Sequence, residues 1–317
     1  MSSKDGMKEY KKGIECLKTS CIKCRFQPDF TSAIPYLKTA ADEFHSCNNF
    51  EKEIEARHQL ITCFQKEESF WEEGKENEKL SNLYLTKLKS PSESYNSIES
   101  AYNAYIRHHS YEDSIKCLMK ASDNFLEQEN DKEAEKCLDL AFDGIKKNYH
   151  VMTMDENASQ MYIYDCIDKY INLAFQKEKF KKGAIISNRG AELIKKEKSD
   201  EINLIDKYYG IQAIAEIVDK EKDKEDKYKD TIKKGTKLIN NESGLCYKVN
   251  SLMNKIKKYN NEEDKEIMDM VYEISAKVPN NVYKKLYKYV EDNKINDIKN
   301  EKDKITGYDD DESSDLR

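Results

Sequence analysis

The sequence predicts an all-α protein, built as an array of antiparallel helix hairpins. Only 38% of its 317 residues are hydrophobic while 36% are charged, which leaves a thin core of the kind found where stacked helices touch only their neighbours. Ten glycines and four prolines are too few for a β-rich or loop-rich chain. A single core usually stops growing near ~250–300 residues, so the length also favours an extended array or two domains.

Two stretches place residues at the same offsets of 0, 3, 7 and 10, which puts each set on one face of a helix. The sets are Tyr95, Ile98, Tyr102 and Tyr105, then Ile115, Leu118, Ser122 and Phe125. Each stretch is therefore predicted to be an amphipathic helix.

Helix starts are marked by a capping residue followed three positions later by an acid. The caps are Ser90, Ser110 and Asn130, and the acids are Glu93, Asp113 and Glu133. Each acid can bond back to the backbone N–H of its cap, and Pro91 stands where a first helical turn tolerates proline. The caps are 20 residues apart, which leaves room for about 14–16 helical residues and a short turn. Successive helices must then run antiparallel, and a hairpin repeats about every 40 residues.

Small residues seven positions apart give a second signature, because two turns of small side chains let a neighbouring helix approach closely. The pairs are Ala33 with Ala40, Ser114 with Ala121, Ala134 with Ala141, and Ala184 with Ala191. This pattern is typical of tetratricopeptide-like repeats, so we expect a tetratricopeptide-like superhelical array. Pro35 would lie past the first turn of a helix that starts near Asp29, which predicts a kink or a later start.

After residues 240–244 the small-residue pattern fades and three further apolar sets follow. They run from Leu245 to Ile256, from Ile267 to Val278 and from Val282 to Val290. The predicted organisation is a sheet of helix hairpins over 1–240, a C-terminal helical bundle over 241–305 and a flexible acidic tail over 306–317. Residues 307–317 carry five acids and one base, so they hold −4 of the net charge of −7.

The loop between the first two predicted helices carries an apolar pair with flanking cations. Ile22 and Phe26 lie beside Lys23 and Arg25. An exposed pair of this kind suits insertion into an anionic bilayer interface. In the alternative, Ile22 and Phe26 fold back and cap the first hairpin.

Composition and motifs exclude several functions. The net charge of −7 argues against an extended basic surface for nucleic acid, and no apolar run approaches the ~18–20 residues that span a bilayer. The chain contains no glycine-rich phosphate loop, dinucleotide fingerprint or helical His-Glu-x-x-His motif. We therefore assign no catalytic residue, cofactor or metal site, and expect a protein that is not an enzyme.

The nine cysteines predict reduced cytosolic thiols, because several fall on apolar helical positions such as Cys63, Cys117 and Cys137. Cys21 and Cys24 have the spacing of half a zinc or redox site, but no second pair follows at ligand distance. Two free thiols in a loop are the expected state of this pair.

Read in order, the first loop, the helices after it and the acidic tail resemble the soluble N-ethylmaleimide-sensitive factor attachment protein (SNAP) family. The residues that carry the resemblance are Lys18-Thr19, Pro28-Asp29-Phe30, Ala33, Lys38-Thr39-Ala40-Ala41, Phe44 and the tail. The spacing from Lys18 to Pro28 looks like the gamma type, allowing one extra loop residue, whereas the ending Asp315-Leu316-Arg317 looks like the alpha type.

The resemblance implies a non-enzymatic adaptor that binds a four-helix, syntaxin-type SNARE complex and recruits a hexameric AAA ATPase to disassemble it during vesicle fusion and intracellular transport. It further implies a protein that is monomeric when free, binds no nucleic acid, and is cytoplasmic but peripherally associated with vesicle, Golgi or endosomal membranes. Ile22 and Phe26 would contact the membrane. The contact with the ATPase would come from the tail residues Asp309, Asp310, Asp311, Glu312, Asp315 and Leu316.

Two other classes of function stay open. A general helical-repeat scaffold that binds peptide tails predicts a groove and no role for Leu316. An enzyme on a helical scaffold would need clustered acids or histidines in a pocket, and the sequence offers no such spacing. The residues that would contact SNARE proteins are not identified from the sequence.

Overall fold

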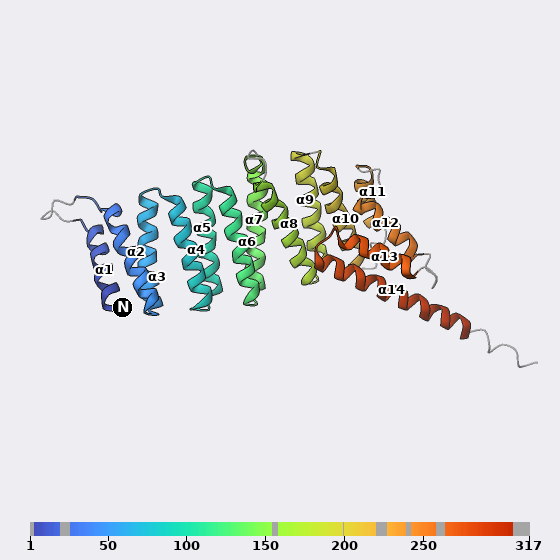
Figure 1. The fold of residues 1–317 in the computed structure, drawn as a ribbon, viewed down its shortest axis with the longest axis horizontal. Coiled ribbons are helices and arrows are strands. Elements are labelled where there is room, and N and C mark those ends of the chain that lie inside the picture. The colour runs from blue at the N-terminus through green and yellow to red at the C-terminus, as the bar shows by residue number, and fades with distance from the viewer. Residues whose placement is uncertain are drawn as a thin grey trace, which may run out of the picture. The chain divides into compact units, whose positions relative to one another are not determined.

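The computed structural model describes residues 3–19, 26–153, 158–198, 200–219, 227–238, 242–257 and 264–306, and within these ranges the regular structure consists of fourteen α-helices and no strand (Figure 1). The predicted all-α class is confirmed. The chain forms two compact units, Met1–Cys166 and Ile167–Arg317, divided within helix α8 (Ala158–Gln176). No sequence signal marks this division, and the predicted ranges for hairpins, bundle and tail stay a prediction.

The helices of the first unit are α1 (Ser3–Leu17), α2 (Phe30–Ser46), α3 (Phe50–Lys66), α4 (Phe70–Thr86), α5 (Pro91–Arg107), α6 (Tyr111–Glu127) and α7 (Asp131–Met152). From α2 onward, they start 20 or 21 residues apart. Each packs against the next in the chain, and Figure 1 shows them side by side in chain order. Helices α2 to α6 each have 17 residues, so with a short turn they give the predicted spacing of about 20.

The turns after α2, α3, α5 and α6 share one backbone motif, in which Asn48, Glu68, His109 and Glu129 adopt a left-handed conformation. After α3, for example, the N–H of Ser69 donates to the carbonyl of Phe64 at 2.9 Å and the N–H of Glu68 donates to Gln65 at 3.4 Å. These two bonds form a Schellman motif, which ends one helix and reverses the chain for the next. The turn after α4 is different: Lys89 is also left-handed there, but the N–H of Ser90 donates to the carbonyl of Tyr84 at 3.0 Å.

Predicted caps have the right positions but different bonds. Ser90, Ser110 and Asn130 are the N-cap residues of α5, α6 and α7, yet none of their side chains bonds a backbone N–H of its helix. They bond nearby groups instead: the Ser110 hydroxyl lies 2.8 Å from Nδ1 of His108, and the Asn130 amide donates to the carbonyl of Gln128 at 3.0 Å. The predicted capping boxes are therefore wrong in detail, because local side-chain partners compete with the helix ends.

Small residues lie at the seams between helices, as the sequence predicts. All eight members of the predicted pairs are buried: Ala33, Ala40, Ser114, Ala121, Ala134, Ala141, Ala184 and Ala191. Helix α2 begins at Phe30 with Asp29 as its cap, so the predicted later start is wrong and Pro35 lies inside the helix. The carbonyl of Pro35 accepts a bond from the Thr39 hydroxyl at 2.9 Å.

The second unit is arranged around one helix. Its elements beyond α8 are α9 (Phe180–Glu197), α10 (Ile202–Val218), α11 (Lys227–Thr236), α12 (Leu245–Ile256), α13 (Asp264–Ser275) and α14 (Asn280–Thr306). Helix α10 packs against α9, α11, α12 and α14, and twelve of its seventeen residues are buried. The three helices predicted after residue 244 are present as α12, α13 and α14.

Candidate functional site

The first candidate site is the loop between α1 and α2, whose base is closed by backbone bonds. The N–H of Asp29 donates to the carbonyl of Cys16 at 3.1 Å, and the Asp29 carboxylate accepts the N–H of Ser32 at 2.9 Å. Phe26, three residues before this anchor, leaves 74% of its surface exposed. The alternative in which Phe26 folds back onto the hairpin is therefore wrong, whereas Ile22, Lys23 and Arg25 lie outside the described residues.

The predicted ATPase-contact residues also lie outside the described residues, which end at Thr306 with helix α14. These are Asp309, Asp310, Asp311, Glu312, Asp315 and Leu316. Their assignment stays a prediction from the resemblance.

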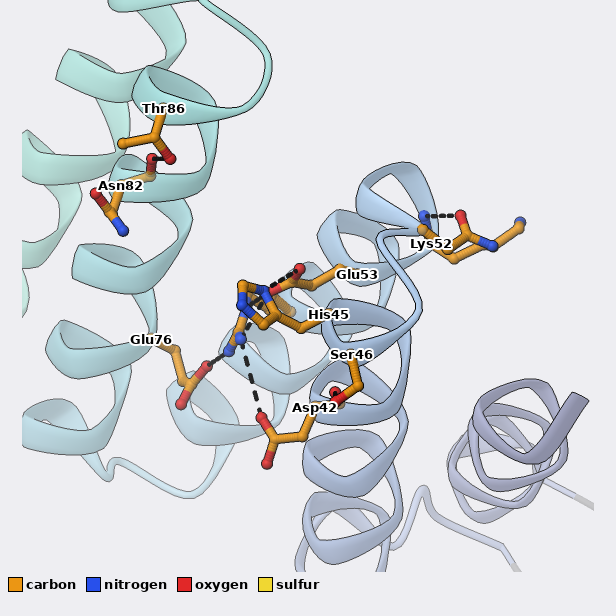
Figure 2. Close-up of polar contacts among 10 residues, drawn as sticks. Asp42, His45, Ser46, Lys52, Glu53, Glu76, Asn82 and Thr86 are labelled. Carbon is orange, nitrogen blue, oxygen red and sulfur yellow. Dashed lines mark hydrogen bonds and ion pairs between the residues drawn. The ribbon is translucent and has the colours of Figure 1, made fainter. Parts of the chain in front are cut away.

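A buried ionic cluster, which the sequence did not reveal, joins α2, α3 and α4 (Figure 2). Arg57, only 6% exposed, donates from Nε to Glu53 at 2.8 Å and from Nη1 to Glu76 at 2.6 Å. We call Glu53, Arg57 and Glu76 the Arg57 cluster. Its carboxylates reach solvent through partners at its edge: Glu53 lies 2.9 Å from Nδ1 of His45, and Glu76 accepts Nζ of Lys79 at 2.6 Å.

One helix further along, Glu73 repeats this arrangement at the seam with α5. It is 1% exposed, and its two oxygens lie 2.7 and 2.8 Å from Nη2 of Arg107. The Gln65 amide of α3 donates to the same carboxylate at 2.8 Å. The guanidinium of Arg107 also lies 4.6 Å from the ring centre of Phe70, so one side chain supplies both an ion pair and a cation–π contact.

A sequence signal for these buried acids exists in the 20-residue repeat itself. Glu53 and Glu73 stand 20 residues apart, in step with Glu93, Asp113 and Glu133, which the sequence predicts to be capping acids. In α3 and α4 the acid at this position instead turns inward to an arginine. The i, i+4 spacing of Glu53 and Arg57 indicates one such pair, but Arg107 is 34 residues from Glu73 and no local pattern indicates that contact.

Cys63, Cys117 and Cys137 are buried thiols that form no disulfide within the described ranges, which confirms their predicted placement on apolar helical positions. Burial raises the pKa of Cys63 to about 11 and that of Cys137 to about 12, and it also raises the pKa of Cys117. These three thiols therefore stay protonated near neutral pH, where a nucleophile or metal ligand must be a thiolate. In the described ranges no group of three His, Cys, Asp or Glu residues is placed to hold a metal ion; Cys21 and Cys24 lie outside those ranges.

Comparisons with known proteins leave the family open. No protein-family model matches this sequence, and no curated protein shows significant similarity to it. Among the helices of the described ranges, none combines the length and the apolar character that crossing a bilayer requires.

Proposed function

We propose that this chain is an adaptor of the SNAP type, which binds assembled SNARE complexes and recruits and stimulates the hexameric AAA ATPase that disassembles them. The proposal starts from the resemblance in residues 18–44 and in the acidic tail. The observation that carries it furthest is Phe26, which remains 74% exposed although the loop that bears it is anchored to both neighbouring helices.

The proposal includes a tetratricopeptide-like superhelical arrangement of the hairpins. The near-constant interval between helix starts from α2 to α7, the repeated Schellman turns and the buried small residues support it. Such an array offers a long surface for a helical bundle while each repeat contacts only its neighbours.

Membrane contact is assigned to Phe26 together with Ile22. Burying one phenylalanine side chain contributes roughly 1.5–3 kcal/mol, which is too little to anchor a protein alone. The loop therefore works as one signal among several, assisted by Lys23 and Arg25 against anionic lipid. We propose a cytoplasmic protein, monomeric when free, that visits vesicle, Golgi or endosomal membranes peripherally.

Contact with the ATPase is assigned to the tail, in which five acids and Leu316 would meet a basic surface. Charge steers the encounter, and an apolar anchor slows dissociation. The energy for disassembly comes from ATP hydrolysis by the partner.

The decisive experiment is ATP-dependent disassembly of a preformed syntaxin-type SNARE complex by the ATPase, in solution and on anionic liposomes. Disassembly should require this chain and should fall strongly with Leu316→Ala in both settings. A Phe26→Ser variant should lose activity on liposomes, where the membrane contact is needed. It should keep its activity in solution, because an exposed side chain contributes little to folding. Tyr272→Ser, which removes another exposed aromatic side chain that is 73% exposed, is the matched control and should keep activity in both settings.

Contrary results would separate the rival functions. Full activity of Leu316→Ala would remove the tail from the mechanism, and an unchanged ATPase rate with wild-type chain would reject the adaptor altogether. A chain that binds short peptides but no SNARE complex would instead be a general helical-repeat scaffold.

A further inference from the structure

The first unit contains a groove to which the proposed adaptor function assigns no role. Residues of α4, α5 and α6 line this groove. Its volume is about 480 Å³, which falls in the range of ~300–1,000 Å³ typical of ligand sites. Its depth follows from small side chains in its lining. Ser81 and Ser94, whose hydroxyl oxygens lie 2.9 Å apart, and Ala121 are all buried there.

Three polar side chains on the rim have no bonding partner within the part of the chain that the structure describes. They are Asn82 on α4 and Lys120 and Asn124 on α6, so both walls contribute. Figure 2 shows Asn82 on α4, where the Thr86 hydroxyl donates to its backbone carbonyl at 2.8 Å and leaves the carboxamide unused. Two carboxamides, each with a donor and an acceptor, match the alternating N–H and C=O groups of a peptide backbone.

Lining charges favour an acidic occupant. Lys75, Lys79 and Lys120 line the groove against one acid of the lining, Glu78. Lys75 is held by Glu78 at 3.1 Å, and Lys79 by Glu76 of the Arg57 cluster at 2.6 Å. Lys120 is exposed and pairs with no acid among the described residues, so it is the cation best able to pair with an incoming carboxylate.

We propose that this groove binds an extended acidic segment of a partner protein. Asn82 and Asn124 bond its backbone, Lys120 pairs with a carboxylate, and the floor with Ile98 and Ala121 accepts a small apolar side chain. A basic segment is disfavoured because it would bring cations against three lysines. The site involves neither Phe26 nor Leu316, so its test stands apart from that of the adaptor function.

The test is fluorescence anisotropy with the full chain and a fluorescein-labelled short peptide of alternating glutamate and leucine; the same peptide with lysine in place of glutamate is the comparison. The acidic peptide should bind more tightly, and Lys120→Glu should weaken its binding about tenfold because one attraction becomes a repulsion. Asn82→Ala with Asn124→Ala should weaken it by about fivefold or more, the effect of about two lost hydrogen bonds. Higher salt should reduce the Lys120 effect.

Matched controls lie on exposed positions outside the groove lining. Lys147→Glu on α7 and Asn103→Ala on α5 should bind the acidic peptide as the wild type does. All of these positions are at least partly exposed on helices, so every variant should fold as the wild type does. Circular dichroism and thermal melting check this. Equal binding of both peptides, equal loss in the Lys147→Glu control, or no binding of the acidic peptide would overturn the proposal. Self-association of the chain that Lys120→Glu abolishes would assign the groove to a second copy and would also overturn it.

Discussion

The two units differ in what their helices bury. In the first, α3 and α4 carry carboxylates into the seams and pair them with arginines, as in the Arg57 cluster and the Glu73–Arg107 pair. In the second, α10 is covered on several sides by apolar contacts, and its buried carboxylate Asp206 accepts the N–H groups of Leu245 and Cys246 at the start of α12.

Helix environment explains this difference. A helix that touches only the helices before and after it keeps its seams near the surface, so a buried acid there can pair with an arginine and still reach solvent-facing groups such as His45 and Lys79. Helix α10 is covered by four other helices, so a buried acid on it has no such contact with solvent-facing groups. The buried carboxylate of Asp206 on α10 is instead satisfied by backbone N–H groups at the start of α12, which have no partner within their own helix, and by the positive end of that helix.

The largest expected effect comes from breaking the Arg57 cluster. Arg57→Met leaves Glu53 and Glu76 buried without their common partner, which should lower the free energy of unfolding by about 3–5 kcal/mol. Urea denaturation followed by circular dichroism measures the change. Lys147→Met, at an exposed position of α7, is the control and should stay within about 0.5 kcal/mol of wild type.

A triple variant sharpens this test. Glu53→Met, Arg57→Met and Glu76→Met together replace the charges by apolar groups of similar length, which is often neutral or stabilising in other proteins. Recovery of most of the lost stability would show that the cluster contributes little net stability and acts in specifying which helices pair. A triple variant as unstable as Arg57→Met would contradict that view.

Asp206 should come next in size. Asp206→Ala removes two bonds from a charged acceptor to the start of α12, each worth ~1.5–3 kcal/mol, less what water recovers, so we expect a loss of about 2–4 kcal/mol. Asp206→Asn keeps one acceptor and should lose about half as much. Urea denaturation measures both, and equal stability of Asp206→Ala and wild type would remove the helix-end argument for the second unit.

Sequence patterns predicted what repeats locally and missed what depends on distant partners. The period of 20, the cap positions and the small residues of the seams all arise within one or two helices, and the structure confirms them. Glu73 with Arg107 and Asp206 with Leu245 join residues 34 and 39 positions apart, and no local pattern encodes such pairs. Of the candidate site residues, the structure describes Phe26, which is exposed, and its contact with a membrane stays a prediction.

Alkaline pH should weaken the first unit through its buried thiols. The pKa of Cys137 is raised by burial from 9.0 to about 12, so the thiol keeps its proton in the folded chain but loses it in the unfolded chain above pH 9. The unfolded state therefore binds fewer protons, and stability should fall between pH 9 and about pH 12 but not below pH 9. Tyr95, whose pKa burial also raises to about 12, acts in the same direction from pH 10.

Urea midpoints measured from pH 7 to pH 11 provide the test. Cys137→Ala should show a shallower fall between pH 9 and pH 10 than wild type, because Tyr95 contributes little there. Leu138→Ala, which removes a buried side chain that does not titrate, is the control and should lower the midpoint while keeping the wild-type dependence on pH. Parallel curves for wild type and Cys137→Ala would refute a role for this thiol.

The smallest effect concerns the turns of the first unit, where residues other than glycine hold a left-handed conformation. Glu129 has φ of 60°, is exposed, and follows helix α6 in the position that usually takes glycine. Glu129→Gly relieves the clash of Cβ with the backbone, which amounts to about 1–2 kcal/mol, but gives the unfolded chain more freedom. The balance should be a stabilisation of about 0.5–1 kcal/mol, seen as a higher urea midpoint with the same slope. Lys147→Gly, at an exposed position in the interior of α7, should instead destabilise by about 1 kcal/mol, because a helix interior places no such strain on its residues. Opposite signs for the two glycines would show that turn geometry, more than composition, maintains the 20-residue repeat; equal signs would contradict this.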